Sequence, residues 1–293
     1  MEKSRVLHSI TGLEGEGAQY MLLRYLGGLK GSAWSSSVLS LLAPGLLGQR
    51  VSDVSTDLLT LGMTEGNVSP ANLVKLAKIV RQTNPDILHG WMYHGNVAAS
   101  VGTMLSLRFA PVVWSVHHSL HDISLEKPLT RRLVRLSARL SSRTSAISYC
   151  SQISADQHEK LGFDPEKTVV IPNGIDCKAF QPVEDAKPRL SGLLSLPPER
   201  SIIGHFARFH PMKDQVRLVR AVKELLDKGY DVQGLFVGAG HVDGAVRQAA
   251  GELGIDSRIS TLGVRDDVAN LMPGLDVYAL PSAWGEAFPL AVA

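Results

Sequence analysis

The sequence predicts an α/β protein made of two parallel sheets, each covered by helices on both faces. Short apolar runs alternate with segments of helical period along the whole 293-residue chain, which is the pattern of repeated strand–helix units. The alternation pauses once, near residues 169–176, and then restarts. The length is sufficient for two domains of ordinary size.

In the first half, apolar runs of strand length recur between longer amphipathic segments. Strands are expected at 6–10, 37–42, 57–61, 86–89, 112–116 and 144–148. Amphipathic helices are expected at 18–29, 69–82 and 128–141. Because strands joined through helices run parallel, we expect their carboxyl ends to meet at one edge of the sheet.

The pause in the pattern marks the domain junction. An apolar run ends in Pro172-Asn173-Gly174, which continues neither a strand nor a helix. Residues 181–200 are rich in proline and indicate a connection with one short helix. Beyond it we expect strands at 201–206, 232–237, 258–262 and 276–280, with helices at 213–228, 242–253 and 266–272. The predicted domains are therefore 1–174 and 175–293.

Composition excludes several classes of protein. A formal net charge of +2 gives no general attraction to nucleic acid. Cys150 and Cys177 fit neither a disulfide framework nor a zinc site and suit a reducing compartment. The apolar run after the first residues is too short for a signal-peptide core, and no apolar run is long enough to span a membrane. We expect a cytoplasmic protein with peripheral membrane contact at most.

A glycine-rich loop follows the first expected strand. Gly12, Gly15 and Gly17 stand just before a helix, where backbone N–H groups can approach a phosphate. An ordinary tight turn explains the same residues equally well. A nicotinamide enzyme would carry an acidic residue after the second strand, but that strand ends in Leu42-Ala43-Pro44. The sequence therefore disfavours a dehydrogenase.

Histidines gather at expected strand ends in the first half. These are His89, His94, His117, His118 and His121, with Asp122 beside the last. We expect them to face a common crevice, since ligands bind at the carboxyl ends of parallel strands. A metal site, structural histidines bonded to loop carbonyls, and contact with a substrate remain as alternatives. We favour substrate contact for His117 because of its position.

In the second half, charged residues follow two expected strands. Arg208 and Lys213 stand between a strand and a helix, where cations oppose the helix dipole unless an anion lies between them. A diphosphate would be such an anion, and a solvated loop is the alternative. Glu286 stands at an expected loop-to-helix transition and is either an ordinary helix-start acid or a partner for sugar hydroxyls. No Asp-x-Asp triplet occurs, so we expect no metal.

Taken in order, these motifs resemble the family 4 glycosyltransferases of GT-B fold. The resemblance covers essentially the whole chain and is strongest in the second half. It rests on the pieces Pro172-Asn173-Gly174, Ala207-Arg208-Phe209 with Lys213-Asp214, Leu262-Gly263 with Asp266-Asp267, and Gly285-Glu286-Ala287-Phe288-Pro289. It implies two Rossmann-like domains that face each other across a cleft, the second of them incomplete in this chain.

The resemblance also implies an activity: retaining transfer of a sugar from a UDP- or GDP-sugar to an acceptor hydroxyl, which the missing Asp-x-Asp triplet predicts to be metal-independent. The acceptor would be a sugar, polysaccharide or lipid-linked molecule in polysaccharide, lipopolysaccharide or glycolipid biosynthesis. The sugar nucleotide is a donor substrate, and no cofactor is expected.

The same resemblance assigns roles to individual residues. Arg208 and Lys213 would bind the donor diphosphate, and Glu286 would contact the donor sugar. His117 would lie near the reacting sugar. The remaining matches are Gly17 at the donor phosphate and acceptor, Val264 at the nucleotide base, and Phe288, whose backbone N–H would meet phosphate.

Two departures from the family pattern affect these expectations. Glu16 occupies the place of a glycine in the first loop, where a carboxylate would repel a diphosphate. The second glutamate of the Glu-x7-Glu pattern would follow Ala293, the last residue. The helix expected from Glu286 has about two turns and is marginal by itself. We therefore expect the 293-residue chain to be weakly active or inactive in a kinetic assay.

A basic stripe marks the expected helix at 128–141. Arg132, Arg135, Arg139 and Arg143 recur at helical spacing, with leucines on another face. The stripe is either an ordinary solvated face or a surface that rests on anionic lipid and brings a lipid-linked acceptor to the crevice.

Two rival functions fit the same fold. A GT-B epimerase or hydrolase would convert the sugar nucleotide without an acceptor. A degenerate binding module would hold UDP or GDP without transferring any sugar.

Overall fold

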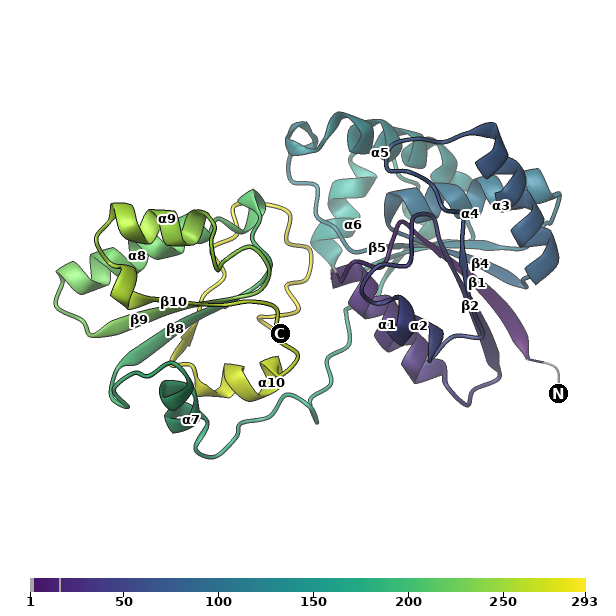
Figure 1. Cartoon of the computed structure of the whole chain (residues 1–293). Helices are drawn as coiled ribbons and strands as arrows, with labels where there is room; N and C mark the ends of the chain where they lie inside the picture. The colour runs from purple at the N-terminus through teal and green to yellow at the C-terminus, as the bar shows by residue number, and fades with distance from the viewer. Residues whose placement is uncertain (1–2, 16) are drawn as a thin grey trace. The chain divides into compact units, whose positions relative to one another are not determined.

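The computed structural model describes residues 3–15 and 17–293 and divides the chain into two compact units. The first unit is Met1–Asn173 and the second is Gly174–Ala293, so the boundary falls one residue before the expected position. Each unit holds one sheet with helices packed on it (Figure 1).

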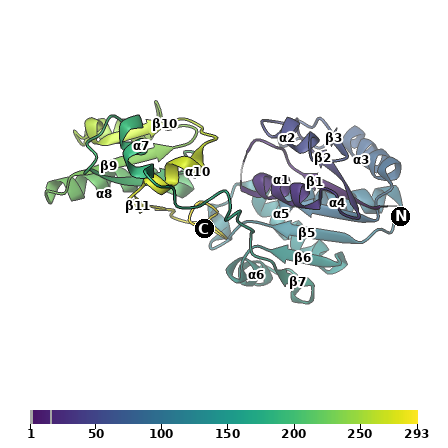
Figure 2. The ribbon, with the colours of Figure 1, turned by 90° about the horizontal axis from the view of Figure 1, so that it is seen from below.

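The first unit contains a seven-stranded parallel sheet with the strand order β3-β2-β1-β4-β5-β6-β7. Figure 2 shows β5, β6 and β7 following one another in that order. The strands are β1 (Ser4–Ile10), β2 (Trp34–Ser40), β3 (Asp57–Thr60), β4 (Ile87–Trp91), β5 (Val112–Val116), β6 (Ala146–Tyr149) and β7 (Thr168–Val170).

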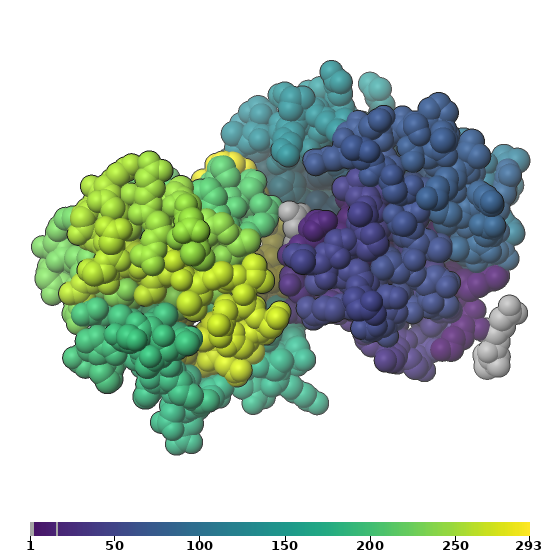
Figure 3. Space-filling model, in the orientation of Figure 1, coloured from purple at the N-terminus to yellow at the C-terminus, as the bar shows by residue number. Residues whose placement is uncertain are grey.

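Helices cover both faces of this sheet because its strands present apolar side chains on both sides. On β1, Leu7 packs into one apolar cluster and Ile10 into another. The first cluster joins the sheet to α3 (Pro70–Thr83), α4 (Met92–Ser106), α5 (Pro128–Leu140) and α6 (Gln152–Glu159); the second joins it to α1 (Gly17–Leu29) and α2 (Gly48–Ser52). In the space-filling view, dark blue residues around α2 and β3 cover the front of the first unit (Figure 3).

The second unit repeats this arrangement on a smaller scale. Its parallel sheet has the order β10-β9-β8-β11. Its strands are β8 (Ser201–Phe206), β9 (Val232–Val237), β10 (Ile259–Leu262) and β11 (Val277–Tyr278). On one face lie α8 (Gln215–Asp227) and α9 (Ala245–Glu252), and on the other α7 (Ala186–Leu193) and α10 (Val268–Leu271). Short 3-10 turns at Ile123–Leu125, Ser141–Arg143, Pro165–Lys167, Pro211–Lys213, Asp256–Arg258 and Met272–Gly274 complete the element order.

The predicted α/β class with two parallel sheets is confirmed, and the largest differences from prediction lie near the end of the chain. The expected strand 276–280 is reduced to β11. The expected helix at Glu286 is wrong: residues 281–289 form no helix, and a turn in which Ala293 N–H donates to Pro289 O closes the segment. The segment instead bonds to a neighbouring loop, where Ala283 N–H donates to Met212 O and Glu286 pairs with Lys213.

The start of α4 brings two backbones into close contact. A Cβ on Gly95 would fall on the carbonyl oxygen of Ser9, and one on Gly90 would meet the backbone of Asn96. The Ser9 hydroxyl also donates to Gly95 O at 2.8 Å. Met92, which opens the helix, has φ of 60°, a left-handed conformation that is strained for a side chain of this size. Close packing of α4 on β1 therefore fixes the exit of β4.

We expect Gly95→Ala to lower the free energy of unfolding by about 2 kcal/mol or more, because the methyl group must displace the backbone of β1. Gly27→Ala in α1 is the matched control, since nothing lies within 4 Å of its added Cβ. That change should leave stability unchanged or raise it by up to about 1 kcal/mol. Urea denaturation measures both, and equal effects of the two substitutions would contradict the packing described.

Candidate functional site

In the second unit, an ion pair joins the loops that leave β8 and β11. Lys213 Nζ lies 2.5 Å from Glu286 Oε1, and both side chains are mostly buried. The hydroxyl of Ser282 donates to the same oxygen at 2.6 Å. The structure therefore brings together two residues that are 73 positions apart in sequence, at the edge where parallel strands end.

Arg208 shares the loop of Lys213. The residue follows β8, and its carbonyl oxygen accepts a hydrogen bond of 2.9 Å from the buried side chain of Gln215. The next residue, Phe209, donates its N–H to Ala239 O at 2.7 Å, which holds the loop against the exit of β9.

The exit of β9 is a glycine loop outside the site residues expected from the sequence. Gly238 has φ of 137°, and a Cβ there would fall on the carbonyl oxygen of Ala207. Gly240 has φ of 83°, and its added Cβ would lie 2.9 Å from Phe209 Cβ. The pattern Gly238-Ala239-Gly240 after an apolar strand was the available signal. These glycines let the exits of β8 and β9 lie against each other.

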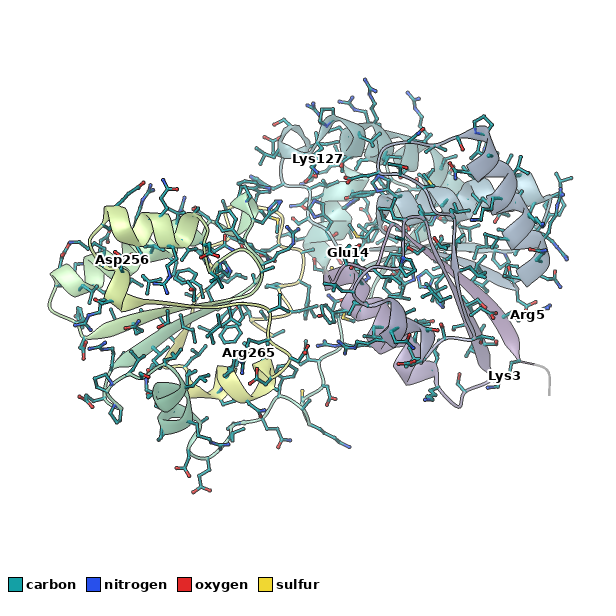
Figure 4. All side chains as sticks on the ribbon, in the orientation of Figure 1. Lys3, Arg5, Glu14, Lys127, Asp256 and Arg265 are labelled. Atoms are coloured by element: carbon teal, nitrogen blue, oxygen red, sulfur yellow. The ribbon has the colours of Figure 1, made fainter. Side chains whose placement is uncertain are left out.

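The remaining second-unit residues lie on the same edge of the sheet. Val264 follows β10 and is 68% exposed. Arg265 beside it, labelled in Figure 4, forms an ion pair with Asp267 at 2.5 Å. Phe288 is half-buried in the irregular segment after β11. The roles expected for Val264 and Phe288 stay predictions.

In the first unit, His117 lies just beyond the carboxyl end of β5 against an aromatic wall. Its ring stacks on Trp91 with ring planes 1° apart and centroids separated by 5.3 Å. Its backbone N–H donates to the sulfur of Met92 at 3.3 Å. The strained Met92 and its neighbour Trp91 therefore fix both the backbone and the ring of His117.

Burial keeps His117 neutral. Desolvation lowers the pKa of its imidazole to about 4, and a hydrogen bond with Asn173 opposes part of that change. Its Nδ1 atom is buried without a hydrogen-bond partner among the described residues. The ring therefore carries no charge at neutral pH.

The expectation that all the histidines share one crevice is wrong. His89 is buried in the sheet and bonds the hydroxyl of Ser115 at 2.7 Å. His118 pairs with Glu126 at 2.8 Å, and His94 is half-buried within α4. His121 and Asp122 are exposed. Side chains alternate between the two faces of β4, and this places His89 in the core. The hydrogen bond with Glu126 directs the ring of His118 toward that carboxylate.

One further buried histidine, His8, extends the aromatic wall beside Trp91. His8 lies 5.1 Å from His89 between ring centroids and accepts a hydrogen bond from Trp91 Nε1 at 3.2 Å. Burial lowers the pKa of His8 well below its ordinary value.

No group of three or more His, Cys, Asp or Glu side chains within residues 3–15 and 17–293 is placed to hold a metal ion.

The first glycine loop leads directly into α1. Gly17 is the first residue of that helix, and Gly15, with φ of 95°, donates its N–H to the buried Gln19 side chain at 2.5 Å. Glu16, whose charge is expected to oppose phosphate binding, lies outside the described residues. The role expected for Gly17 stays a prediction.

In the basic stripe, Arg132, Arg135 and Arg139 lie on α5 as expected and Arg143 lies in the 3-10 turn that follows it, but the leucines are divided between two faces. Leu133 and Leu140 pack on the core, whereas Leu129 and Leu136 are 46% and 41% exposed. They share the outer face with the exposed Arg132, Arg135 and Arg139. The prediction that the leucines lie on a different face from the arginines is therefore wrong for Leu129 and Leu136.

No helix in the described part of the chain is long and apolar enough to cross a membrane.

Two family models together match most of the chain. Residues 16–179 match the model described as Glycosyltransferase Family 4. Residues 189–293 match the model described as Glycosyl transferases group 1.

Several curated proteins are similar in sequence. A phosphatidyl-myo-inositol mannosyltransferase of Mycolicibacterium smegmatis is 32% identical over 76% of this chain and 54% of its own length. The UDP-Gal:alpha-D-GlcNAc-diphosphoundecaprenol alpha-1,3-galactosyltransferase of Escherichia coli is 26% identical over 75% of this chain and 58% of its own length. A putative glycosyltransferase, EpsF of Bacillus subtilis, is 30% identical over 43% of this chain and 33% of its own length. The chain thus spans between a third and about three fifths of these relatives.

Solved structures share the fold. Anabaena HepE in complex with UDP and glucose superposes with a TM-score of 0.79 at 22% identity, covering 97% of this chain and 76% of its own. Sucrose-phosphate synthase of Thermosynechococcus elongatus gives a TM-score of 0.74 at 18% identity, covering 98% and 77%. The expected GT-B fold of two parallel-sheet domains is confirmed.

We expect the ring resonances of His117 to stay unchanged between pH 7.5 and 5 in NMR spectra, since its pKa is about 4. In the unfolded chain the pKa of the imidazole is near its ordinary value of 6.5. Between pH 4 and 6.5 the unfolded state therefore binds more protons than the folded state. The stability that this group contributes is therefore complete above pH 6.5 and is lost as the pH falls toward 4. Spectra of His117→Gln assign the resonances, and a midpoint near 6.5 would contradict the buried, stacked ring.

Proposed function

The chain belongs to glycosyltransferase family 4, and from this membership we propose that it transfers a sugar from a UDP- or GDP-sugar to an acceptor hydroxyl with retention of configuration. The match of both family models in chain order and the shared fold support the activity. A complex with UDP and glucose in a protein of the same fold fits a nucleotide-sugar donor.

The observation that carries the proposal is the pairing of Lys213 with Glu286 at the carboxyl edge of the second sheet. A diphosphate that reaches Lys213 competes with the carboxylate for the ammonium group, because phosphate oxygens and carboxylate oxygens are alternative partners for one cation. Glu286 is then released to accept hydrogen bonds from sugar hydroxyls. The same residues thus bind the leaving group and orient the sugar.

Catalysis by this arrangement is electrostatic. As the sugar–phosphate bond breaks, negative charge accumulates on the departing diphosphate, and fixed cations lower the energy of that state. Arg208 and Lys213 supply two positive charges on one loop, so we propose that the reaction needs no metal ion. Assays in the presence of a chelator test this point directly.

We assign His117 to the sugar. Its neutral ring places no charge near the reacting carbon, and its stacking on Trp91 fixes the orientation of the imidazole. A neutral, oriented donor or acceptor serves recognition rather than proton transfer at neutral pH. Gly17, at the start of α1, would admit the acceptor or donor phosphate close to the backbone.

For the acceptor side, the first unit carries a strongly basic surface. The helices α3, α4 and α5 pack side by side on one face of the sheet, and none of them contains an Asp or a Glu. The exposed cations on these helices and on the residues just after them are Lys75, Lys78, Arg81, Arg108, Arg132, Arg135, Arg139 and Arg143. Lys127 adds a further positive charge just before α5 (Figure 4). In a chain of net charge +2, this surface favours an anionic partner.

Large apolar side chains are exposed among these cations. Phe109 and Leu107 are 97% and 72% exposed, and Leu129 and Leu136 lie between the arginines of α5. Exposed apolar groups set among arginines are typical of surfaces that contact anionic lipid bilayers. We propose that this surface makes peripheral contact with a membrane, where a lipid-linked acceptor would be available. Relatives named for phosphatidyl-myo-inositol and diphosphoundecaprenol acceptors are consistent with this.

Two other activities of the same fold lead to different products. A GT-B epimerase or hydrolase would release free sugar or an epimer without an acceptor. A binding module would retain UDP or GDP and transfer nothing. Product analysis with and without an acceptor separates the three.

We expect Lys213→Met to weaken binding of UDP or GDP by about tenfold or more, because it removes a charged partner of the diphosphate. Lys223→Met on α8 is the matched control: Lys223 also pairs with a carboxylate, that of Asp227. Its loss should change the affinity by less than about twofold. Isothermal titration calorimetry measures both, and equal effects of the two substitutions would refute the donor site.

We expect wild-type protein to float with vesicles that contain anionic lipid, and the triple variant Arg132→Glu, Arg135→Glu, Arg139→Glu to remain mostly unbound. The control reverses three exposed cations of the second unit, Arg217, Arg220 and Lys228, so its net charge changes equally. Equal flotation of both triple variants would remove the membrane proposal.

A further inference from the structure

The loop between β8 and α8 is fixed by hydrogen bonds along its backbone. Ala207 N–H donates to Val237 O at 3.0 Å, and Phe209 N–H donates to Ala239 O at 2.7 Å. Farther on, Met212 O accepts from Ala283 N–H at 2.8 Å. These bonds attach the loop that carries Arg208 and Lys213 to the exits of β9 and β11.

Two buried side chains bind the loop from beneath. His241 Nε2 donates to Ala207 O at 2.7 Å. Gln215 Nε2 donates to Arg208 O at 2.9 Å, and Gln215 Oε1 accepts from His210 N–H at 3.5 Å. His241 is completely buried, and Gln215 is 1% exposed. Because a buried amide without partners is costly, Gln215 specifies where the backbone of Arg208 lies.

Gln215 also connects the loop to the far side of the site through His205. The second N–H of its amide lies 3.3 Å from His205 Nε2, and His205 Nδ1 donates to Ala279 O at 2.9 Å. The ring, which is fully buried in β8, is therefore a neutral tautomer that accepts at one nitrogen and donates at the other. The chain of bonds runs from Arg208 O through Gln215 and His205 to the residue after β11, where the segment bearing Glu286 begins.

Every group in this chain is neutral, whereas the groups presented above it are charged. Burial lowers the pKa of His205 to about 4, although the hydrogen bond to Ala279 O opposes part of that change. A neutral framework can be buried without an ion's desolvation penalty. Rigid support of this kind holds cations where charge develops, so less reorganisation is needed when a diphosphate binds.

We propose that Gln215 and His205 are positioning residues that hold the loop of Arg208 and Lys213 in register with the segment of Glu286, so that a diphosphate meets preformed geometry. The inference rests on the proposed function, since it names the buried groups that shape the same site. Neither residue contacts the diphosphate, and both act through the backbone that they bind.

The test compares two buried glutamines at opposite ends of the sheet. Gln215→Met removes the bonds to Arg208 O and His205. Gln233→Met is the matched control: Gln233 is 2% exposed on β9 and donates to Ser260 Oγ at 3.0 Å and Ser257 O at 3.4 Å, away from the strand exits. Gln215→Glu, which keeps the size and loses both donors, and His205→Phe serve as further variants if Gln215→Met does not fold.

Two readouts are needed. Hydrogen exchange of the full chain should be at least about tenfold faster at residues 207–214 and 279–283 in Gln215→Met, with no change there in Gln233→Met. Binding of UDP or GDP should weaken about tenfold in Gln215→Met, while binding of the corresponding nucleoside monophosphate should change by less than about threefold. A loss confined to the diphosphate separates positioning of the cations from general destabilisation.

Equal exchange in the two methionine variants would overturn the proposal, as would an equal loss of affinity for diphosphate and monophosphate. If neither UDP nor GDP binds the wild-type chain, the proposed function fails. Hydrogen exchange then still decides whether Gln215 and His205 hold the loop.

Discussion

Parallel pairing of every strand in both sheets is the constraint on which the rest of the structure depends. It forces each strand to leave its sheet at the same edge and each connection to return over a face. Residues that are 73 positions apart, such as Lys213 and Glu286, therefore become neighbours. The same constraint brings His117, which follows β5, against Trp91, which ends β4. Both candidate sites are consequences of strand direction.

The edge of the second sheet combines charged and neutral groups in separate layers. Lys213 and Glu286 compensate each other above the strand ends, and beneath them Gln215 and His205 hold the loops through neutral hydrogen bonds. The ammonium group can exchange its carboxylate partner for a phosphate, whereas the buried amide and imidazole keep their partners. This division allows a site to bind an anion while its backbone stays fixed.

Sequence patterns predict the bounds of an element correctly where neighbouring residues alone determine them. The strands 112–116, 201–206 and 232–237 were placed at their observed bounds because apolar runs there stop at residues that end strands. The helix α4 was not named because Tyr93, Asn96 and Ala98 are all buried, so its sequence lacks an amphipathic period. The family resemblance pointed to Lys213 and Glu286, but their contact depends on tertiary structure. Likewise, nothing in the sequence distinguishes Gln215, His205 or the partners of His89 and His118 from ordinary polar residues.

The central claim is that the carboxyl edge of the second sheet binds a nucleoside diphosphate. The most direct measurement is a titration of the isotope-labelled chain with UDP and with GDP, followed by backbone amide shifts. We expect one of them to shift amides at residues 208–213, 263–265 and 282–288, while those of Gln233 and Ser257 at the opposite edge stay in place. Shifts concentrated at the opposite edge, or none with either nucleotide at millimolar concentration, would contradict it.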